Sequence, residues 1–326
     1  MEKISKKKLI SEYREGDAVE DIFVVKIKKG VLSYVKGYSF SLVLTDSSGK
    51  SVDYKYWGGL VEEKVREIYN SINDDSVIYI EGQVGSYNGK LQIASNEFNQ
   101  IKVIEEEEYN KGDFIRKTNK DIEIMYRELE GYIQKVDDEK LKALLTNIFS
   151  EIGESFKGHP AAISIHHNWV GGLLEHVLEV LKYCELSLKL YPNLNKNLLF
   201  TGAMLHDIGK LEEMEMTTRI KGTNKGMFLG HVVLGSIFVS NKMDEICLDG
   251  KTKNKVLHLM ISHHGKEEYG AFKEPMFPEA VALNLADESS SKIAEILNFV
   301  EENERDTEDD FMPKWKKNRP TNIFLR

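Results

Sequence analysis

The segment LHDIGK, residues 205–210, ends an apolar stretch with a histidine that is followed directly by an aspartate. Neighbouring residues on a helix point about 100° apart, so His206 and Asp207 cannot form a site by themselves. Both residue types also occur at helix ends, where they hydrogen-bond unsatisfied backbone groups. Whether this pair belongs to a functional site therefore depends on whether other segments of the chain supply partners for it.

The other histidines lie in the same half of the chain, and all nine occur between residues 159 and 264. Several interrupt or end apolar segments: His176 in LLEHVLEV, His231 in FLGHVVLG, and His263 and His264 after VLHLMIS, while Asp287 lies within AVALNLADE. One such histidine is usually an ordinary core residue, but so many buried polar groups need partners. Imidazole and carboxylate ligands together indicate a divalent metal, and suit Mn²⁺, Fe²⁺, Co²⁺ or Zn²⁺ better than Mg²⁺ or Ca²⁺.

The chain beyond residue 119 has helical periodicity. In residues 121–136, apolar side chains recur at the spacing of one helix face. Further helices are expected in residues 140–149, 171–188, 197–207, 228–243, 254–265 and 278–300, followed by a basic and aromatic C-terminal extension. This half is therefore expected to be an all-α domain.

The chain before residue 105 has the pattern of a β domain. Alternating or β-rich segments occur at residues 19–33, 40–46 and 51–59, and again at 76–95, where an Asn88–Gly89 turn joins two strands. Residues 60–72 between them have helical spacing. Three strands, one helix and two strands follow the order of the OB-fold, a five-stranded barrel. The acidic run Glu105–Glu108 marks a boundary, so we expect an all-β domain at 1–110 and the helical domain at 111–326.

The composition fits two soluble domains, since the 326 residues are 41% hydrophobic and 30% charged. The formal net charge of −9 argues against nonspecific coating of nucleic acid but leaves room for a local basic groove. Two cysteines give no disulfide framework. No apolar run reaches the roughly 18–20 residues of a membrane span, and the N-terminus lacks the apolar region of a secretory signal. These features predict a cytoplasmic protein with no membrane partner.

The order His176, His206–Asp207, Asp287 resembles the H…HD…D signature of the HD phosphohydrolase superfamily, with LLEHVLEV and GAMLHDIGK matching its first two motifs. His231 and the pair His263–His264 resemble the extra ligands of its two-metal members. The segments IHHNWVGGLLEHVLEV, TGAMLHDIGK, LGHVVLGS and MISHHGK further resemble YhaM-type 3′-to-5′ exoribonucleases, which carry an OB-fold before the HD domain.

This resemblance implies a metal site with one or two ions, most readily Mn²⁺, with Co²⁺, Fe²⁺, Zn²⁺ or Mg²⁺ as alternatives. The first ion would be bound by His176, His206, Asp207 and Asp287, and the second by Asp207 as a bridge with His231, His263 and His264. One departure concerns DESSSK, residues 287–292, where the family usually reads D-N-x-D-A-K. Ser290 therefore replaces the family's second acid, which we expect to affect substrate positioning more than metal binding.

The residues expected to act in catalysis beside the metals are Asp207, Lys210 and His167, the last considered together with its neighbour His166. Asp207 would bridge the ions, and Lys210 would reach a phosphate as a point charge, the alternative being an exposed lysine at a helix start. His166 and His167 would contact substrate or protonate the leaving oxygen, with a structural role as the equal alternative. His159 and His258 are not expected to be ligands.

The barrel is expected to hold single-stranded nucleic acid by base stacking and phosphate contacts. The candidates are Lys26, Lys28, Tyr54, Lys55, Tyr56 and Trp57. Tyr54 and Tyr56 share one strand face, so packing inside the barrel is the alternative for both.

Together these features predict a metal-dependent 3′-to-5′ exonuclease that hydrolyses single-stranded RNA, with single-stranded DNA as a further substrate and a homo-oligomer permitted. A rival is an HD phosphohydrolase of small or cyclic nucleotides, although HHGKEEYGAFKEP lacks the Gly-Tyr-Pro segment of the cyclic-dinucleotide enzymes. A second rival is a non-catalytic nucleic-acid-binding adaptor, which is disfavoured because every expected ligand position is filled.

Overall fold

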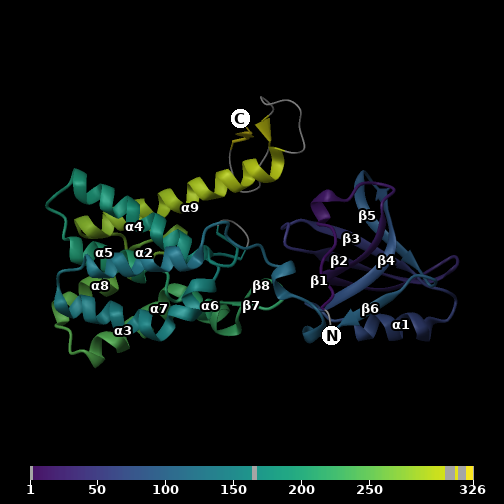
Figure 1. Ribbon diagram of the computed structural model, residues 1–326, viewed down its shortest axis with the longest axis horizontal. Helices are drawn as coiled ribbons and strands as arrows, with labels where there is room; N and C mark the ends of the chain where they lie inside the picture. Colours follow the sequence, from purple (N-terminus) through teal and green to yellow (C-terminus); the bar gives the residue numbers. More distant parts are fainter. Residues whose placement is uncertain (1–2, 164–166, 305–312, 315–320, 326) are drawn as a thin grey trace. The chain divides into compact units, whose positions relative to one another are not determined.

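The chain forms two compact units, one of Met1–Lys117 with Met216–Ile220 and one of Thr118–Glu215 with Lys221–Arg326 (Figure 1). The computed structural model describes residues 3–163, 167–304, 313–314 and 321–325. Most of the expected C-terminal extension, like His166, lies outside the described residues.

The first unit is a closed five-stranded barrel with one helix. Its elements are β1 (Ala18–Tyr34), β2 (Gly37–Thr45), β3 (Ser51–Trp57), α1 (Glu62–Ser71), β4 (Val77–Tyr87), β5 (Lys90–Asn96) and β6 (Ile101–Ile104). The strand order is β1-β2-β3-β5-β4, and pairing of β1 with β4 closes the barrel. This is the OB-fold order, and the expected all-β fold is confirmed. The strand β6, which pairs with β4, was not predicted.

Alternation along the strands explains the barrel core. Inward-facing side chains of β2 such as Phe40 and Leu42 are fully buried, while Ser41 and Val43, which follow them, are only partly buried. The turn between β4 and β5 has positive φ at both Asn88 and Gly89, as a two-residue hairpin of this sequence requires. The long strand β1 contains two register irregularities against β2, which let it bend around the barrel.

The second unit is helical, and all seven expected helices are present. They are α2 (Ile122–Gln134), α3 (Glu139–Gly158), α4 (Gly172–Leu190), α5 (Lys196–Leu205), α7 (Asn224–Glu245), α8 (Gly250–Ser262) and α9 (Pro278–Glu304). The short helix α6 (Lys210–Glu213), the hairpin β7 (Met214–Met216) and β8 (Ile220–Gly222), and the strands β9 (Pro313–Lys314) and β10 (Ile323–Phe324) were not predicted.

Helix α4 is the centre of this unit. It packs against α2, α3, α5 and α9 (Figure 1). Residues 172–181 of this helix are buried except for Glu179, whereas its second half is largely exposed or partly exposed. Helix α7 is interrupted at Gly230, where φ is 70° and ψ is 158°. This break lets His231 begin a separately directed helical segment. Among the described helices, we find none with an apolar stretch long enough to cross a membrane.

Candidate metal centre

The carboxylate of Asp207 lies between two groups of histidines. Its Oδ2 atom is 3.4 Å from Nε2 of His176 and 3.4 Å from Nε2 of His206. Asp287 completes this first group, with Oδ1 at 3.2 Å from Nε2 of His176. We call His176, His206 and Asp287 the first donor set.

The other oxygen of Asp207 faces a second group. Its Oδ1 atom is 3.5 Å from Nε2 of His231 and 3.7 Å from Nε2 of His263. The Nε2 atom of His264 lies 3.1 Å from that of His231. We call His231, His263 and His264 the second donor set, so Asp207 offers one oxygen to each set.

Five helices bring these donors together. His176 lies on α4, His206 and Asp207 follow α5, and Asp287 lies on α9, while the second donor set comes from α7 and the end of α8. The turn after Asp207 requires a glycine, because a Cβ on Gly209 would lie 2.0 Å from the backbone oxygen of His231. This close approach holds α7 against the end of α5 and places His231 beside Asp207.

Each of four donor rings has an acceptor at its second nitrogen. Nδ1 of His206 faces the carbonyl oxygen of Ala203 at 2.9 Å, and Nδ1 of His263 faces that of Met260 at 2.5 Å. Nδ1 of His231 lies 3.1 Å from both carboxylate oxygens of Glu213. Carbonyl and carboxylate oxygens only accept, so each Nδ1 carries the proton and each Nε2 keeps its lone pair for a metal.

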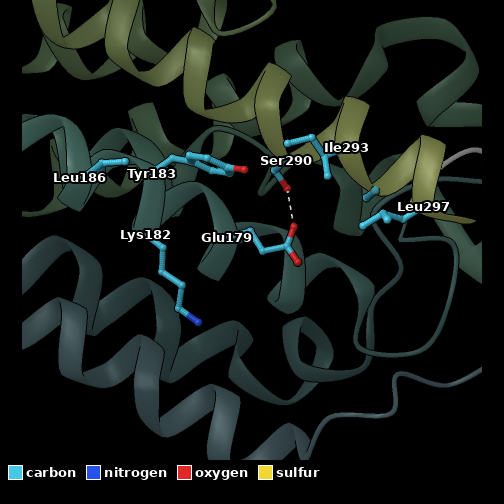
Figure 2. A pocket seen from close by; sticks show the side chains of 8 residues that line it. Glu179, Lys182, Tyr183, Leu186, Ser290, Ile293 and Leu297 are labelled. Atoms are coloured by element: carbon cyan, nitrogen blue, oxygen red, sulfur yellow. Dashed lines mark hydrogen bonds between the residues drawn. The ribbon is translucent and has the colours of Figure 1, made fainter. Parts of the chain in front are cut away.

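The fourth ring, that of His176, contacts the hydroxyl of Ser290, which is itself hydrogen-bonded to the carboxylate of Glu179. Nδ1 of His176 lies 3.0 Å from Oγ of Ser290, and that hydroxyl donates to Oε2 of Glu179 at 2.8 Å. Figure 2 shows this bond among the side chains of α4 and α9 that line a pocket of ≈ 440 Å³. Ser290 thus links the carboxylate of Glu179 to a donor ring.

The donor chemistry fits divalent metal ions. Oδ1 of Asp207 and Nε2 of His263 are two of the buried side-chain atoms that have no hydrogen-bond partner within the described residues. Burial opposes ionisation of Asp207, but the positive charge of Lys210 helps to hold its pKa well below the usual range. Burial also lowers the pKa of His263 well below its usual value. A charged carboxylate and a neutral imidazole are the forms that bind metals.

Lys210 and His167 both lie beside the donors, and both are buried. Nζ of Lys210 is 2.7 Å from Oδ2 of Asp207, so it is not an exposed lysine at a helix start. Nε2 of His167 is 3.3 Å from Oε2 of Glu179, and its ring centroid is 5.5 Å from that of His176. His167 also has a left-handed backbone with φ of 47°, which is uncommon outside glycine.

Besides the two donor sets, His167, Glu175 and Glu179 form a further cluster of possible metal-binding side chains, which adjoins the first donor set. Glu175 already accepts hydrogen bonds from Thr118 at 2.8 Å and Trp169 at 2.9 Å, and pairs with Lys120 at 2.7 Å. These donors satisfy the carboxylate without a metal, so the cluster supports the donors rather than adding a site.

Two other histidines contact backbone groups. Nε2 of His159 lies 2.8 Å from the carbonyl oxygen of Lys210. His258 accepts a hydrogen bond from the backbone of Met276 at 3.1 Å.

Three supporting residues were missed at the level of sequence. Glu179 lies three residues after His176, a spacing that puts both on one helix face, so it could have been found. Lys120 and Glu213 carry no such signal.

The expectation that Tyr54 and Tyr56 stack on bases is wrong. Their side chains are 0% and 4% exposed, because both point into the barrel, where Tyr56 stacks on Phe40. Lys28 is also unsuited to phosphate binding, since its ammonium donates to the carbonyl oxygens of Tyr69 and Ile72 at the end of α1.

The remaining barrel candidates, Lys26, Lys55 and Trp57, reach the surface. Trp57 is 39% exposed, and the ammonium of Lys55 lies 4.9 Å from its ring centroid. Trp57 also lines a pocket of ≈ 520 Å³ together with the side chains of Gln83, Asn96 and Asn99. An aromatic ring, a cation and amide groups are suited to holding nucleotides.

A protein-family model matches the central part of the helical unit. Residues 173–292 match the family model of the HD domain. HD domains are metal-dependent phosphohydrolases, and both donor sets lie within the matched residues. The match therefore agrees with the metal-binding chemistry of the described side chains.

Several solved structures resemble about 30% of the chain. The second OB-fold domain of replication protein A from Methanococcus maripaludis is 21% identical over 30% of this chain and 95% of that one, with a TM-score of 0.24. An OB domain from Thermoplasma acidophilum is 13% identical over 30% and 85%, with a TM-score of 0.22. A murine DNA-binding protein bound to double-stranded DNA is 16% identical over 31% of this chain, with a TM-score of 0.23, and the chain spans 49% of its length. The assignment of the barrel rests on its own strand order.

Proposed function

We propose that this protein is a metal-dependent exonuclease that shortens single-stranded RNA from its 3′ end, with single-stranded DNA as a further substrate. The observation that carries the proposal is the carboxylate of Asp207, which offers Oδ2 to the first donor set and Oδ1 to the second. Such a shared carboxylate suits two ions a short distance apart, the arrangement used for phosphodiester hydrolysis. The 3′-to-5′ direction is supported by the resemblance to the YhaM-type enzymes.

Divalent metals bound at the two donor sets would supply an activated water and neutralise charge on the phosphoryl oxygens. The chain's own residues keep the donors in place for this chemistry. Lys210 lies 2.7 Å from Oδ2 of Asp207, which supports a role for its positive charge in binding a phosphate beside the donors. The acceptors at each Nδ1 fix the ring orientations before substrate arrives.

We assign His167 a positioning role. Its side chain is 1% exposed, so it is poorly placed to touch a leaving oxygen directly. Its contact with Glu179 instead steadies the carboxylate that fixes Ser290 and, through it, His176. The barrel would bind a part of the strand that is distant from the 3′ end. Trp57 would stack on a base there, and Lys26 and Lys55 would lie near phosphates.

A second candidate function is hydrolysis of a small nucleotide. It is favoured by a pocket of ≈ 380 Å³ beside the donors, which is in the size range for a single small molecule. The OB-fold barrel, with its exposed Trp57, favours the polymeric substrate instead.

The test is incubation of purified protein with a 5′-labelled single-stranded RNA, with Mn²⁺ or with chelator. A ladder that shortens from the 3′ end, and that disappears with chelator and in Asp207→Ala, is the expected result. Asp137→Ala is a matched control, because Asp137 is an exposed acid of the same unit. Absence of shortening of RNA and DNA with every divalent metal would refute the proposal, and turnover of mononucleotides alone would favour the second candidate.

A further inference from the structure

A pocket of ≈ 380 Å³ opens beside both donor sets. It is lined by His264 from the second set and by Asp287 from the first, so a molecule inside it would lie against both. Lys266 and Tyr269, from the loop after α8, also line it. We propose, on the basis of the function proposed above, that this pocket binds the terminal nucleotide of the strand. Its base would stack on Tyr269 and its phosphate would pair with Lys266.

The loop that carries these two residues is ordered by backbone hydrogen bonds and close packing. The backbone N–H of Ala271 donates to the carbonyl oxygen of Lys266 at 3.1 Å, and that of Phe272 donates to the carbonyl oxygen of Ile261 on α8 at 3.0 Å. Gly265 begins the loop with φ of 78°, packed so closely that a Cβ there would lie 2.7 Å from the side-chain amide of Asn284. The loop is therefore anchored to both α8 and α9, and little ordering is needed when a nucleotide binds.

The charges in the pocket leave Lys266 available for a phosphate. Its ammonium is 3.6 Å from Glu268, and the two side chains are 64% and 63% exposed, so water screens this pair and it is easily exchanged. The other lysine of the pocket, Lys292, is paired with Glu288 one helical turn away on α9. This pairing neutralises the charge of Glu288, which would otherwise repel a phosphate.

Tyr269 supplies the surface for a base. Its side chain is 62% exposed although it borders a pocket beside the donors. Stacking would cover the face of the ring, and every base has a face that can stack. The pocket should therefore accept all four bases and select for a nucleotide with a phosphate rather than for a sequence.

The first test compares Tyr269→Ala and Lys266→Ala with the wild-type protein in digestion of a labelled RNA. Loss of one stacking contact should raise KM by about 5- to 150-fold with little change in kcat. Tyr269→Phe should restore the wild-type KM, because it keeps the ring. Phe272→Ala and Lys273→Ala are matched controls, since both belong to the same exposed loop and lie outside the pocket lining.

The second test measures binding of uridine and adenosine 5′-monophosphate to the metal-loaded proteins by calorimetry. Both nucleotides should bind the wild-type protein with similar affinity, and both should bind Tyr269→Ala and Lys266→Ala more weakly. If the wild-type protein digests RNA but these variants match the controls in KM and nucleotide affinity, the pocket inference is overturned and the exonuclease proposal stands. If no RNA or DNA is digested, the exonuclease proposal fails, while the nucleotide affinities still decide the pocket.

Discussion

Replacing Ser290 with alanine should weaken metal binding at the first donor set alone. The change removes an acceptor 3.0 Å from Nδ1 of His176 and a donor 2.8 Å from Oε2 of Glu179. Loss of the group that orients a metal-binding histidine typically costs about 10- to 100-fold in affinity. We therefore expect Ser290→Ala to reduce the binding free energy of one ion by about 1.4 to 2.8 kcal/mol.

The assay is a calorimetric titration of metal-free protein with Mn²⁺, which reports the two binding events separately. The event at the second donor set should keep its affinity, because His231 and His263 are oriented by Glu213 and by a backbone carbonyl. Ser290→Thr keeps the hydroxyl and should bind both ions normally.

Ser289→Ala is the matched control, since that hydroxyl donates to the carbonyl oxygen of Leu285 on its own helix at 2.6 Å. If Ser290→Ala folds normally and binds both ions as the wild type does, packing alone orients His176 and the reasoning is refuted. An equal loss in Ser289→Ala would also refute it, because the effect would then belong to the helix.

Three further predictions follow from particular contacts. Burial lowers the pKa of His159 to about 4, below the ordinary value near 6.5, so the unfolded chain binds the proton first and stability falls as the pH drops below 6.5. In His159→Gln, the decrease in the free energy of unfolding from pH 7 to pH 5 should be about 2 kcal/mol smaller than in the wild type, as measured by urea unfolding. An unchanged pH dependence would contradict this. Gly209→Ala places a Cβ 2.0 Å from the backbone oxygen of His231, so guanidinium unfolding should show a loss of about 1–3 kcal/mol, and wild-type stability would contradict the packing. Trp57→Ala should weaken binding of a labelled oligonucleotide by about 5- to 150-fold in fluorescence anisotropy while hydrolysis of bis(p-nitrophenyl) phosphate stays unchanged; equal effects on both would argue against a role in strand binding.

Periodicity was enough to predict the helices and the barrel, because spacing directly reflects which face of an element is buried. It could not decide the role of Tyr54 and Tyr56, since alternation shows that two residues share a face and not which face closes inward. The strand β6 and the hairpin of β7 and β8 are too short to carry a periodic signal.

The site could be predicted as a set of residue types but not as a geometry. The order of histidines and aspartates, with its resemblance to HD enzymes, predicts the ligand residues and a bridging role for Asp207, whereas the distances between these side chains depend on how five helices pack. Glu213 was unpredictable because it ends a helix of four residues, α6, and meets His231 only through the tertiary fold. The role of Ser290 likewise depends on α9 lying against α4.

The spread of the donors along the chain also has a consequence for biosynthesis. The donors span residues 176 to 287, and Asp287 lies on α9, so a growing chain has no complete set of donors until α9 has been made. Contacts between distant segments form late in folding. Metal uptake should therefore coincide with completion of the helical unit, and bound metal would distinguish finished molecules from truncated ones.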